Sequence, residues 1–182
     1  MPAIRAFCCS FTTLAAVAVL SGGVGGVAGV AEAAPAATES TCSQGYLPLP
    51  DPSCTPGALN PDVTQSTIGS TICVSGWTAT VRPSTSYTNK LKTQGIADYG
   101  YSDTSLSDYE EDHFLPLELG GAPKDPKNLW PEPHSGDENS YSKDSVENKV
   151  KKAVCADQVT LADAQDAMLT DWTTAESVLG IG

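Results

Sequence analysis

The stretch 109–131 constrains the fold more tightly than any other part of this chain. Three acidic residues lead into a histidine, the run then alternates apolar residues, and a Gly-Gly pair precedes a second short apolar segment that Asn128 opens. Short segments of this kind, separated by a glycine turn, predict a strand, a turn and a second strand. Asp112 and His113 are expected at the mouth of this hairpin. Successive strand residues point to opposite faces, so the two converge on one site only where the strand begins or kinks.

The same stretch resembles the core of a known enzyme family. Asp112-His113, a following Pro-Leu and Gly-Gly, and Asn128-Leu129 about fifteen residues after the histidine are similar to the core of HNH endonucleases, the ββα-metal nucleases. The fuller run, from Glu111 to Pro133, resembles a group of secreted, HNH-like bacterial proteins. This likeness extends from about Ser70 to Trp172 and includes Thr71-Ile72-Cys73, Trp77-Thr78, Val81-Arg82-Pro83 and Lys143-Asp144. The ordered set is much more specific than Asp-His alone.

The resemblance implies a metal-dependent endonuclease whose substrate is DNA, or RNA. Such hydrolysis needs a general base that takes a proton from water, and one divalent metal that stabilises charge on the phosphate and the leaving oxygen. By resemblance, His113 is the base, Asp112 is a metal ligand, and Asn128 positions the loop that carries the histidine. The residue types agree, since a neutral imidazole accepts protons at neutral pH and a carboxylate suits Mg²⁺. Mn²⁺, Ca²⁺ and Zn²⁺ are the alternative cofactors.

Plainer interpretations of the same residues stay open. Asp112 and His113 also suit a strand-end ion pair, or a solvated acidic run with a surface histidine. Asn128 also suits a turn cap without a catalytic part.

The third residue on the metal side departs from the family pattern. Family members place a histidine or asparagine about nine residues after the middle asparagine, where this chain has Asp137 in a Gly- and Ser-rich loop. The candidates for this position are Glu147 and Asn148 on the helix and His134 in the loop. Helical geometry favours Glu147, which borders the predicted buried face, while Asn148 matches the family's residue type but points away. His134 is more often simply a loop histidine, so the position stays open.

The formal net charge of −12 argues against easy nucleic-acid binding, because phosphate-binding proteins usually present a basic face. The cations are scattered, except that Lys149, Lys151 and Lys152 form a small basic patch beside the predicted site. We predict Arg82 and Lys151 as substrate-binding residues, Arg82 through its planar guanidinium. An ion pair between Arg82 and a nearby acid is the alternative.

Two other classes of function fit the same residues. One is a catalytically silent binding or cell-surface module on an HNH-like frame, which the net charge and the displaced third ligand favour. The other is a Ca²⁺-stabilised structural domain that uses Glu110, Glu111 and Asp112. A nuclease needs both metal and activity, a binding module needs neither, and a structural site gains only stability from metal. An exported nuclease can also have an inhibitor protein as its partner.

Three regions are predicted along the chain. Residues 1–34 have the features of a secretory signal peptide, with an apolar stretch and the small-x-small cleavage signal Ala31-Glu32-Ala33. Residues 35–66 are rich in proline and predict an extended arm without regular structure. Residues 67–182 are the expected HNH-like domain. The mature protein is therefore expected to be secreted and to have no stable membrane association.

The cysteines that remain after cleavage are Cys42, Cys54, Cys73 and Cys155. This even number predicts two disulfides in an exported protein. Zinc is the alternative, but no pair has the short C-x₂₋₄-C spacing that is usual for zinc. Sequence proximity favours Cys42–Cys54, which ties the proline-rich arm, and elimination then leaves Cys73–Cys155.

The expected fold class is α+β: a ββα-metal core with an N-terminal β-hairpin, C-terminal helices and two disulfides. The N-terminal hairpin is predicted over Thr71–Arg82, where β-branched residues alternate around a break at Ser75-Gly76. A short helix is predicted over Thr85–Gly95.

Two helices are predicted after the central motif. Ser142 or Asp144 caps the first, which follows an irregular loop over Pro131–Tyr141 and runs to about Ala156. Its apolar stripe is Val146, Val150, Ala153 and Val154. The second begins at a capping box formed by Thr160 and Asp163. Its core face is Leu161, Ala164, Met168 and Trp172.

Overall fold

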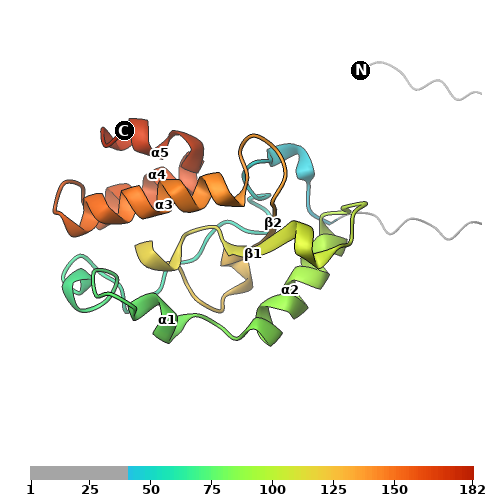
Figure 1. Ribbon diagram of the computed structural model, residues 1–182, viewed down its shortest axis with the longest axis horizontal. Helices are drawn as coiled ribbons and strands as arrows, with labels where there is room; N and C mark the ends of the chain where they lie inside the picture. Colours follow the sequence, from blue (N-terminus) through green and yellow to red (C-terminus); the bar gives the residue numbers. More distant parts are fainter. Residues whose placement is uncertain (1–40) are drawn as a thin grey trace, which may run out of the picture. The chain divides into compact units, whose positions relative to one another are not determined.

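The computed structural model describes residues 41–182, and the expected signal peptide lies outside the described residues. The helices and strands of this part are α1 (Trp77–Val81), α2 (Thr85–Asp98), β1 (Tyr109–His113), β2 (Leu129–Pro133), α3 (Ser140–Cys155), α4 (Leu161–Asp171) and α5 (Ala175–Leu179) (Figure 1). Short 3₁₀ turns, among them Leu117–Leu119 and Pro126–Asn128, connect them. Helices and a small antiparallel sheet together make an α+β arrangement, as predicted.

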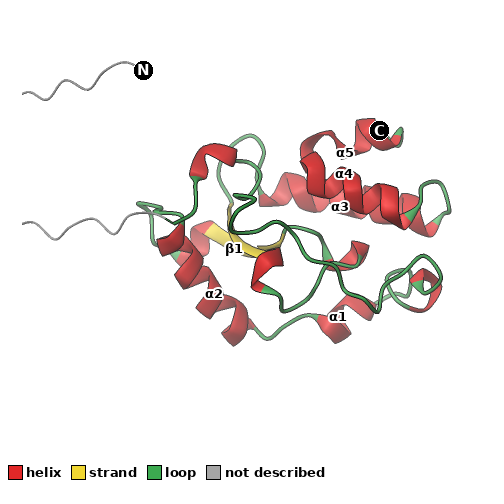
Figure 2. Ribbon diagram, turned by 180° about the vertical axis from the view of Figure 1, so that it is seen from behind, coloured by secondary structure: helices red, strands yellow, loops and turns green. Residues whose placement is uncertain are grey.

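The two strands form the sheet of the described part, with Asp112 opposite Trp130 and His113 opposite Leu129. Helix α2 contacts both strands and α3 contacts β1. Figures 1 and 2, which view the molecule from opposite sides, both place β1 between α2 and α3. The predicted strand–turn–strand is confirmed, but β1 is the acidic run itself. Asp112 and His113 therefore end the strand instead of beginning it.

The core lies where α3 and α4 pack over the sheet and its connecting loop. The predicted stripe of α3 is confirmed, since Val150, Ala153 and Val154 are buried and Val146 packs against them. The core face predicted for α4 is confirmed as well: Leu161, Ala164 and Met168 of α4 are buried, and so is Trp172 in the 3₁₀ turn that follows. The cap of α4 is also as expected: the Thr160 side chain accepts a hydrogen bond from the Asp163 amide at 3.1 Å. Apolar periodicity thus positions both helices against the hairpin.

The N-terminal β-hairpin prediction over Thr71–Arg82 is wrong. Residues 71–76 form turns, Gly76 has the left-handed φ of 80°, and Trp77–Val81 is the helix α1. Trp77 and Val81 are both partly buried and stand four residues apart, which is one helical turn, while Ala79 and Thr80 between them are exposed. The apparent alternation of β-branched residues therefore hides a helical pattern.

The start of α3 also differs from the prediction. Strand β2 runs on to Pro133, and the helix begins at Ser140 with Asn139, not Ser142 or Asp144, as its cap. The Asn139 side chain accepts hydrogen bonds from the Tyr141 and Ser142 amides at 3.0 and 3.2 Å. Ser142 returns the bond, since its hydroxyl accepts from the Asn139 amide at 2.8 Å. This reciprocal pair is a capping box one turn earlier than expected.

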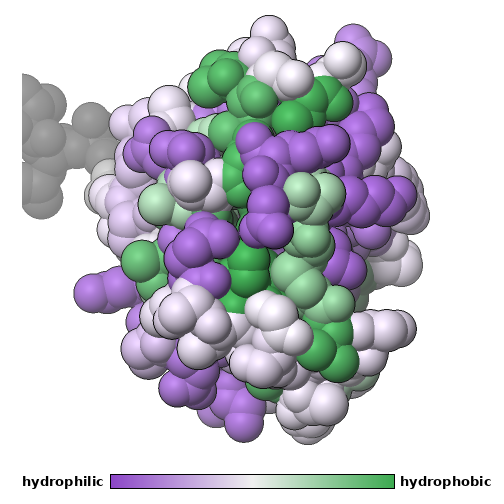
Figure 3. Space-filling view, turned by 90° about the vertical axis from the view of Figure 1, so that its left-hand side faces the viewer, coloured by the Kyte–Doolittle hydropathy of each residue, from purple (hydrophilic) through white to green (hydrophobic). Residues whose placement is uncertain are grey.

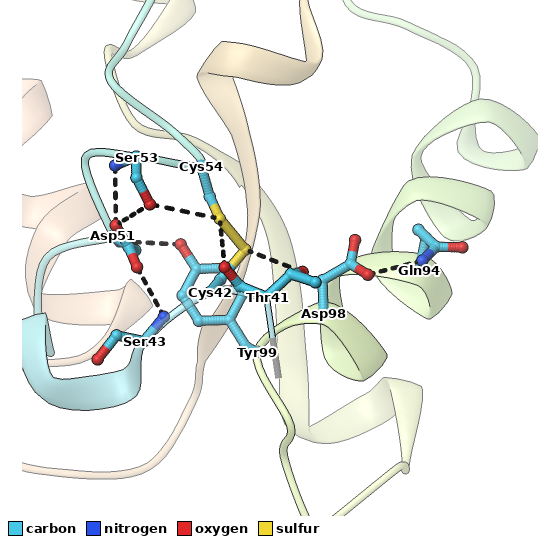
Figure 4. The surroundings of a disulfide bond; sticks show 9 residues. All are labelled: Thr41, Cys42, Ser43, Asp51, Ser53, Cys54, Gln94, Asp98 and Tyr99. Carbon is cyan, nitrogen blue, oxygen red and sulfur yellow. Dashed lines mark hydrogen bonds between the residues drawn. A yellow bond between two sulfur atoms is a disulfide. The ribbon is translucent and has the colours of Figure 1, made fainter. Parts of the chain in front are cut away.

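Both predicted disulfides, Cys42–Cys54 and Cys73–Cys155, are present. Figure 4 shows the first beside Asp51, whose carboxylate accepts hydrogen bonds from Ser43 and Ser53. The Asp51 amide in turn donates to the hydroxyl of Tyr99 at 2.9 Å. Segment 41–66 packs against the same core, to which it contributes buried Cys42 and Val63.

The surface is mixed in character. The face drawn in Figure 3 is a mosaic of hydrophobic and hydrophilic side chains. Among residues 41–182, no helix is both long and apolar enough to cross a membrane.

Candidate functional site

Asn128 holds the loop that follows β1. Its side chain is fully buried, and its carbonyl oxygen accepts from the Leu115 amide at 2.8 Å. Its amide nitrogen donates to the carbonyl oxygens of Leu115 and Ala122 at 2.9 and 3.2 Å. A side chain at Gly121 would meet the Leu115 oxygen at 1.8 Å, so only glycine fits beside this clip. The position of the loop after His113 thus depends on both residues.

Replacing Asn128 with alanine should lower the free energy of unfolding by about 2–5 kcal/mol, because several buried backbone groups lose their partners. Asn128→Asp should cost at least as much, since two carbonyl oxygens would then face a carboxylate. Urea unfolding measures both. Asn148→Ala, on the exposed side of α3, is the control and should change stability by less than about 0.5 kcal/mol. Equal effects at Asn128 and Asn148 would contradict this account of the loop.

His113 is buried and oriented by the backbone. Its Nε2 lies 3.1 Å from the carbonyl oxygen of Pro123, and a carbonyl oxygen can only accept, so Nε2 carries the proton. Nδ1 is therefore the nitrogen with the free lone pair. Within residues 41–182 it makes no hydrogen bond, and it is not fully buried, so solvent can reach it. Burial lowers the pKa of His113, and the charges of Arg82 and Lys143 act in the same direction. The imidazole is thus neutral at neutral pH.

A pocket of about 300 Å³ opens beside His113, between β1, α2 and the segment before α2. Arg82, Lys92, Glu110 and His134 are among its lining residues. Arg82 is exposed and takes part in none of the salt bridges found in residues 41–182. Its charge nevertheless acts on Glu110, on His113 and on Asp144 of α3. An unpaired guanidinium thus stands beside the imidazole.

On the side of β1 that faces α3, the Lys143 ammonium is fully buried among acceptors. It donates to the Asp112 carboxylate at 2.6 Å, to the backbone carbonyl of His113 at 3.0 Å, and to the Glu147 carboxylate through a short contact. Burial alone would lower the pKa of Lys143, but the charges of Asp112 and Glu147 outweigh it and hold that pKa well above its usual value. We call Lys143, Asp112, Glu147 and Glu132 the lysine cluster.

The pKa values of the carboxyl groups in the lysine cluster are shifted in opposite directions. Burial works to raise the pKa of Asp112, but the charge and hydrogen bond of Lys143 outweigh it and hold the pKa below its ordinary value. Burial and the Asp112 charge raise the pKa of Glu132 well above its ordinary value, although the charge of Lys143 opposes this. Glu132 makes no hydrogen bond of good geometry within the described part, but it lies close enough to interact with Asp112. Burial raises the pKa of Glu147 to about 8, although Lys143 opposes this.

Sequence reasoning missed the roles of Lys143 and Glu132. Lys143 and Glu147 stand four residues apart on one helix, a spacing that could have indicated their pairing. Glu132 lies in a Pro-Glu-Pro run, and no sequence pattern signals that it is buried.

The remaining predicted residues fall at different places. Asn148 is exposed and donates to the backbone oxygen of Asp144, so it does not face Asp112. His134 lines the pocket, but its Nδ1 lies 2.6 Å from the Ser140 hydroxyl and its ring stacks on Tyr141. Lys151 acts on Glu118 of the 3₁₀ turn and does not line the pocket. Asp137 is exposed in the loop before α3.

Glu111 lies apart from the lysine cluster and makes stability depend on pH. Burial raises its pKa to about 8, against the opposing charge of Lys92, and its Oε2 has no hydrogen-bond partner in residues 41–182. The folded chain therefore keeps a proton that the unfolded chain releases above its ordinary pKa of 4.5. The stability that this proton contributes is complete below that value and is lost as pH rises towards 8.

We expect the melting temperature to fall as pH is raised from about 5 to about 8, and Glu111→Gln to flatten that dependence. Thermal unfolding followed by circular dichroism measures it. Glu176→Gln, which removes a surface partner of Lys149, should leave the pH dependence as it is. An unchanged slope in Glu111→Gln would show that Glu111 ionises normally in the folded chain.

The expected metal ligands do not form a cation site in this arrangement. One oxygen of Asp112 and one of Glu147 bond the Lys143 ammonium, and Asn148 lies elsewhere. Within residues 41–182, no group of three or more His, Cys, Asp or Glu residues is placed to hold a metal ion. A divalent ion between these carboxylates would have to displace a fully buried lysine, so no chemical step is assigned to a metal below.

Comparison with protein-family models, with curated proteins and with solved structures finds no match to this chain in any of the three.

Proposed function

We propose that this protein is a secreted, HNH-like phosphodiester hydrolase that acts on DNA or RNA, with His113 as its general base. The observation that carries the proposal is the His113 imidazole: the Pro123 carbonyl holds its Nε2 proton, which leaves Nδ1 as the proton acceptor, and His113 lines a pocket together with the unpaired Arg82. A fixed, neutral imidazole next to an anion-binding group is what general-base hydrolysis of a phosphate ester requires.

The order of elements supports the HNH-like frame. Two antiparallel strands are followed by α3, which contacts β1, as in a ββα core. Asn128 clips the loop after His113, which is the role that the resemblance gives to the middle asparagine. Two disulfides suit an exported protein.

In the proposed reaction, His113 Nδ1 takes a proton from a water molecule as the water oxygen attacks phosphorus. The bond from phosphorus to the leaving oxygen then breaks, and that oxygen takes up a proton. Glu110 lines the same pocket and burial raises its pKa, so it is the candidate donor. Arg82 neutralises charge on the phosphate through its planar guanidinium.

A catalytically silent binding module is the second candidate. The engagement of Asp112 and Glu147 by Lys143 favours it, since both carboxylates then serve the fold. The net charge of −12 favours it as well, because a phosphate backbone is repelled by an acidic protein.

Digestion of plasmid and of single-stranded DNA by residues 35–182 at low salt tests the proposal. The assay includes Mg²⁺, Mn²⁺, Ca²⁺ or EDTA, and compares the wild type with Arg82→Gln. Cutting by the wild type is expected, and Arg82→Gln should slow it by about tenfold or more, since the guanidinium acts on the charged phosphate. Lys124→Gln is the matched control. A folded, oxidised sample that cuts nothing under any condition would leave the silent module as the function.

A further inference from the structure

We propose that the Lys143 ammonium is the resident cation of this site, in the place where the resemblance expects a divalent metal. The inference rests on the proposed function only in treating the lysine cluster as part of the site. It predicts that the wild type keeps its geometry without a metal, and that removal of Lys143 creates a metal site where none is accessible now.

The hydrogen-bonding capacity of the ammonium is filled. A lysine ammonium has three N–H donors, and Lys143 places them on Asp112, on Glu147 and on the backbone oxygen of His113. With the residue fully buried, no donor is left for water. The ammonium is therefore held as a coordinated ion would be, by oxygen atoms on separate elements.

The charges of the lysine cluster also fit a built-in cation. A buried ammonium is expensive unless ionised partners surround it, and Asp112 supplies a full negative charge beside it. Glu132 is buried beside this cluster, and neither of its carboxyl oxygens bonds the lysine within the described part. A divalent ion that entered this cluster would first have to remove the cation that balances it.

The Lys143 ammonium also contacts β1, the strand that carries His113. Its bond to the His113 carbonyl joins the first turn of α3 to the end of β1, where the proposed base is carried. Lys143 is thus a positioning residue: it acts on His113 through the backbone and through Asp112, and it does not line the pocket beside the imidazole.

Thermal unfolding with millimolar Mn²⁺, Ca²⁺ or Mg²⁺ against EDTA tests the inference without using activity. The melting temperature of the wild type should shift by less than about 1 °C, because a ligand that finds no site gives no linked stabilisation. Lys143→Ala leaves Asp112, Glu132 and Glu147 around an open space, so its melting temperature should rise by several degrees with Mn²⁺ or Ca²⁺. Lys149→Ala, nearly two helical turns further along α3, should bind no metal.

Two results would overturn the inference. One is a metal-induced shift in the wild type that Asp112→Asn abolishes, which would show that the ion displaces Lys143. The other is a folded Lys143→Ala that responds to metal no more than Lys149→Ala does. If Lys143→Ala does not fold, titration of the wild type with Mn²⁺, followed by its paramagnetic resonance signal, decides instead: saturable binding lost in Asp112→Asn overturns the inference, and no binding upholds it. Absence of nuclease activity alters neither readout, so the two proposals fail separately.

Discussion

Replacing His113 with alanine is expected to lower the rate of phosphodiester hydrolysis by about 10²–10⁴-fold, the usual contribution of a positioned general base. A chromogenic nitrophenyl ester of thymidine 5′-phosphate measures the rate without demanding tight DNA binding. The KM should change little, because the imidazole acts on water and not on the substrate. His134→Ala is the control, since His134 lines the same pocket but is engaged by Ser140 and Tyr141.

The pH profile should carry the signature of the same imidazole. His113 must be neutral to accept a proton, and its pKa lies below the ordinary 6.5. The rate should therefore fall on the acid side, with a midpoint below that value, and it should fall again on the alkaline side as the proton donor Glu110 ionises. A His113→Ala variant that keeps wild-type activity, or an acid limb centred above the ordinary pKa, would remove His113 from the role of base.

Replacing Lys143 with methionine is expected to lower the free energy of unfolding by about 3–5 kcal/mol, because Asp112 is then left as an uncompensated buried charge. Methionine has nearly the same length, so the loss reflects charge more than packing. The melting temperature should drop by about 10 °C, given about 2–4 °C per kcal/mol for a chain of this size. Differential scanning calorimetry measures both quantities.

Two further variants separate charge from volume. Lys149→Met, on the same helix as Lys143, breaks a surface pair with Glu176 of α5 and should change stability by less than about 1 kcal/mol. The triple variant Lys143→Met, Asp112→Asn, Glu147→Gln removes all the charge and should recover much of the loss, since a buried ion pair replaced as a whole is often nearly neutral. No recovery in the triple variant would assign the effect of Lys143 to packing.

Local patterns predicted those parts of the fold whose sequence and burial agree. The apolar stripes of α3 and α4 identified both helices, because one face of each packs on the core. The glycine turn and Asn128 identified the hairpin, and an even number of cysteines led to both disulfides. In these places short-range chemistry and tertiary packing require the same conformation.

The sequence pattern gave a wrong prediction over residues 71–82, where long-range contacts determine the local structure. Residues 71–82 have strand-like composition, but Ile72 is buried in a turn and Cys73 is joined to Cys155 at the end of α3. These long-range contacts select turns and a short helix over a hairpin. β-propensity is weak enough for packing to override it.

The sequence indicated candidate residues for the site, but it did not indicate how their side chains are arranged. The resemblance predicts that Asn128 positions the loop that carries the histidine, and the Asn128 side chain bonds the backbone of Leu115 in that loop. The lysine cluster was not predicted, because lysine and glutamate four residues apart usually pair on the surface of a helix. Only the packing of α3 against β1 buries Lys143 and Glu147 and brings them to Asp112.

The most direct test of the proposed function is the rate at which supercoiled plasmid is nicked by the wild type and by His113→Ala, purified side by side as residues 35–182. We predict nicking by the wild type in every buffer, EDTA included, and its near-complete loss in His113→Ala. Equal rates for the two proteins, or no nicking by either while both are folded, would contradict a hydrolytic site at His113.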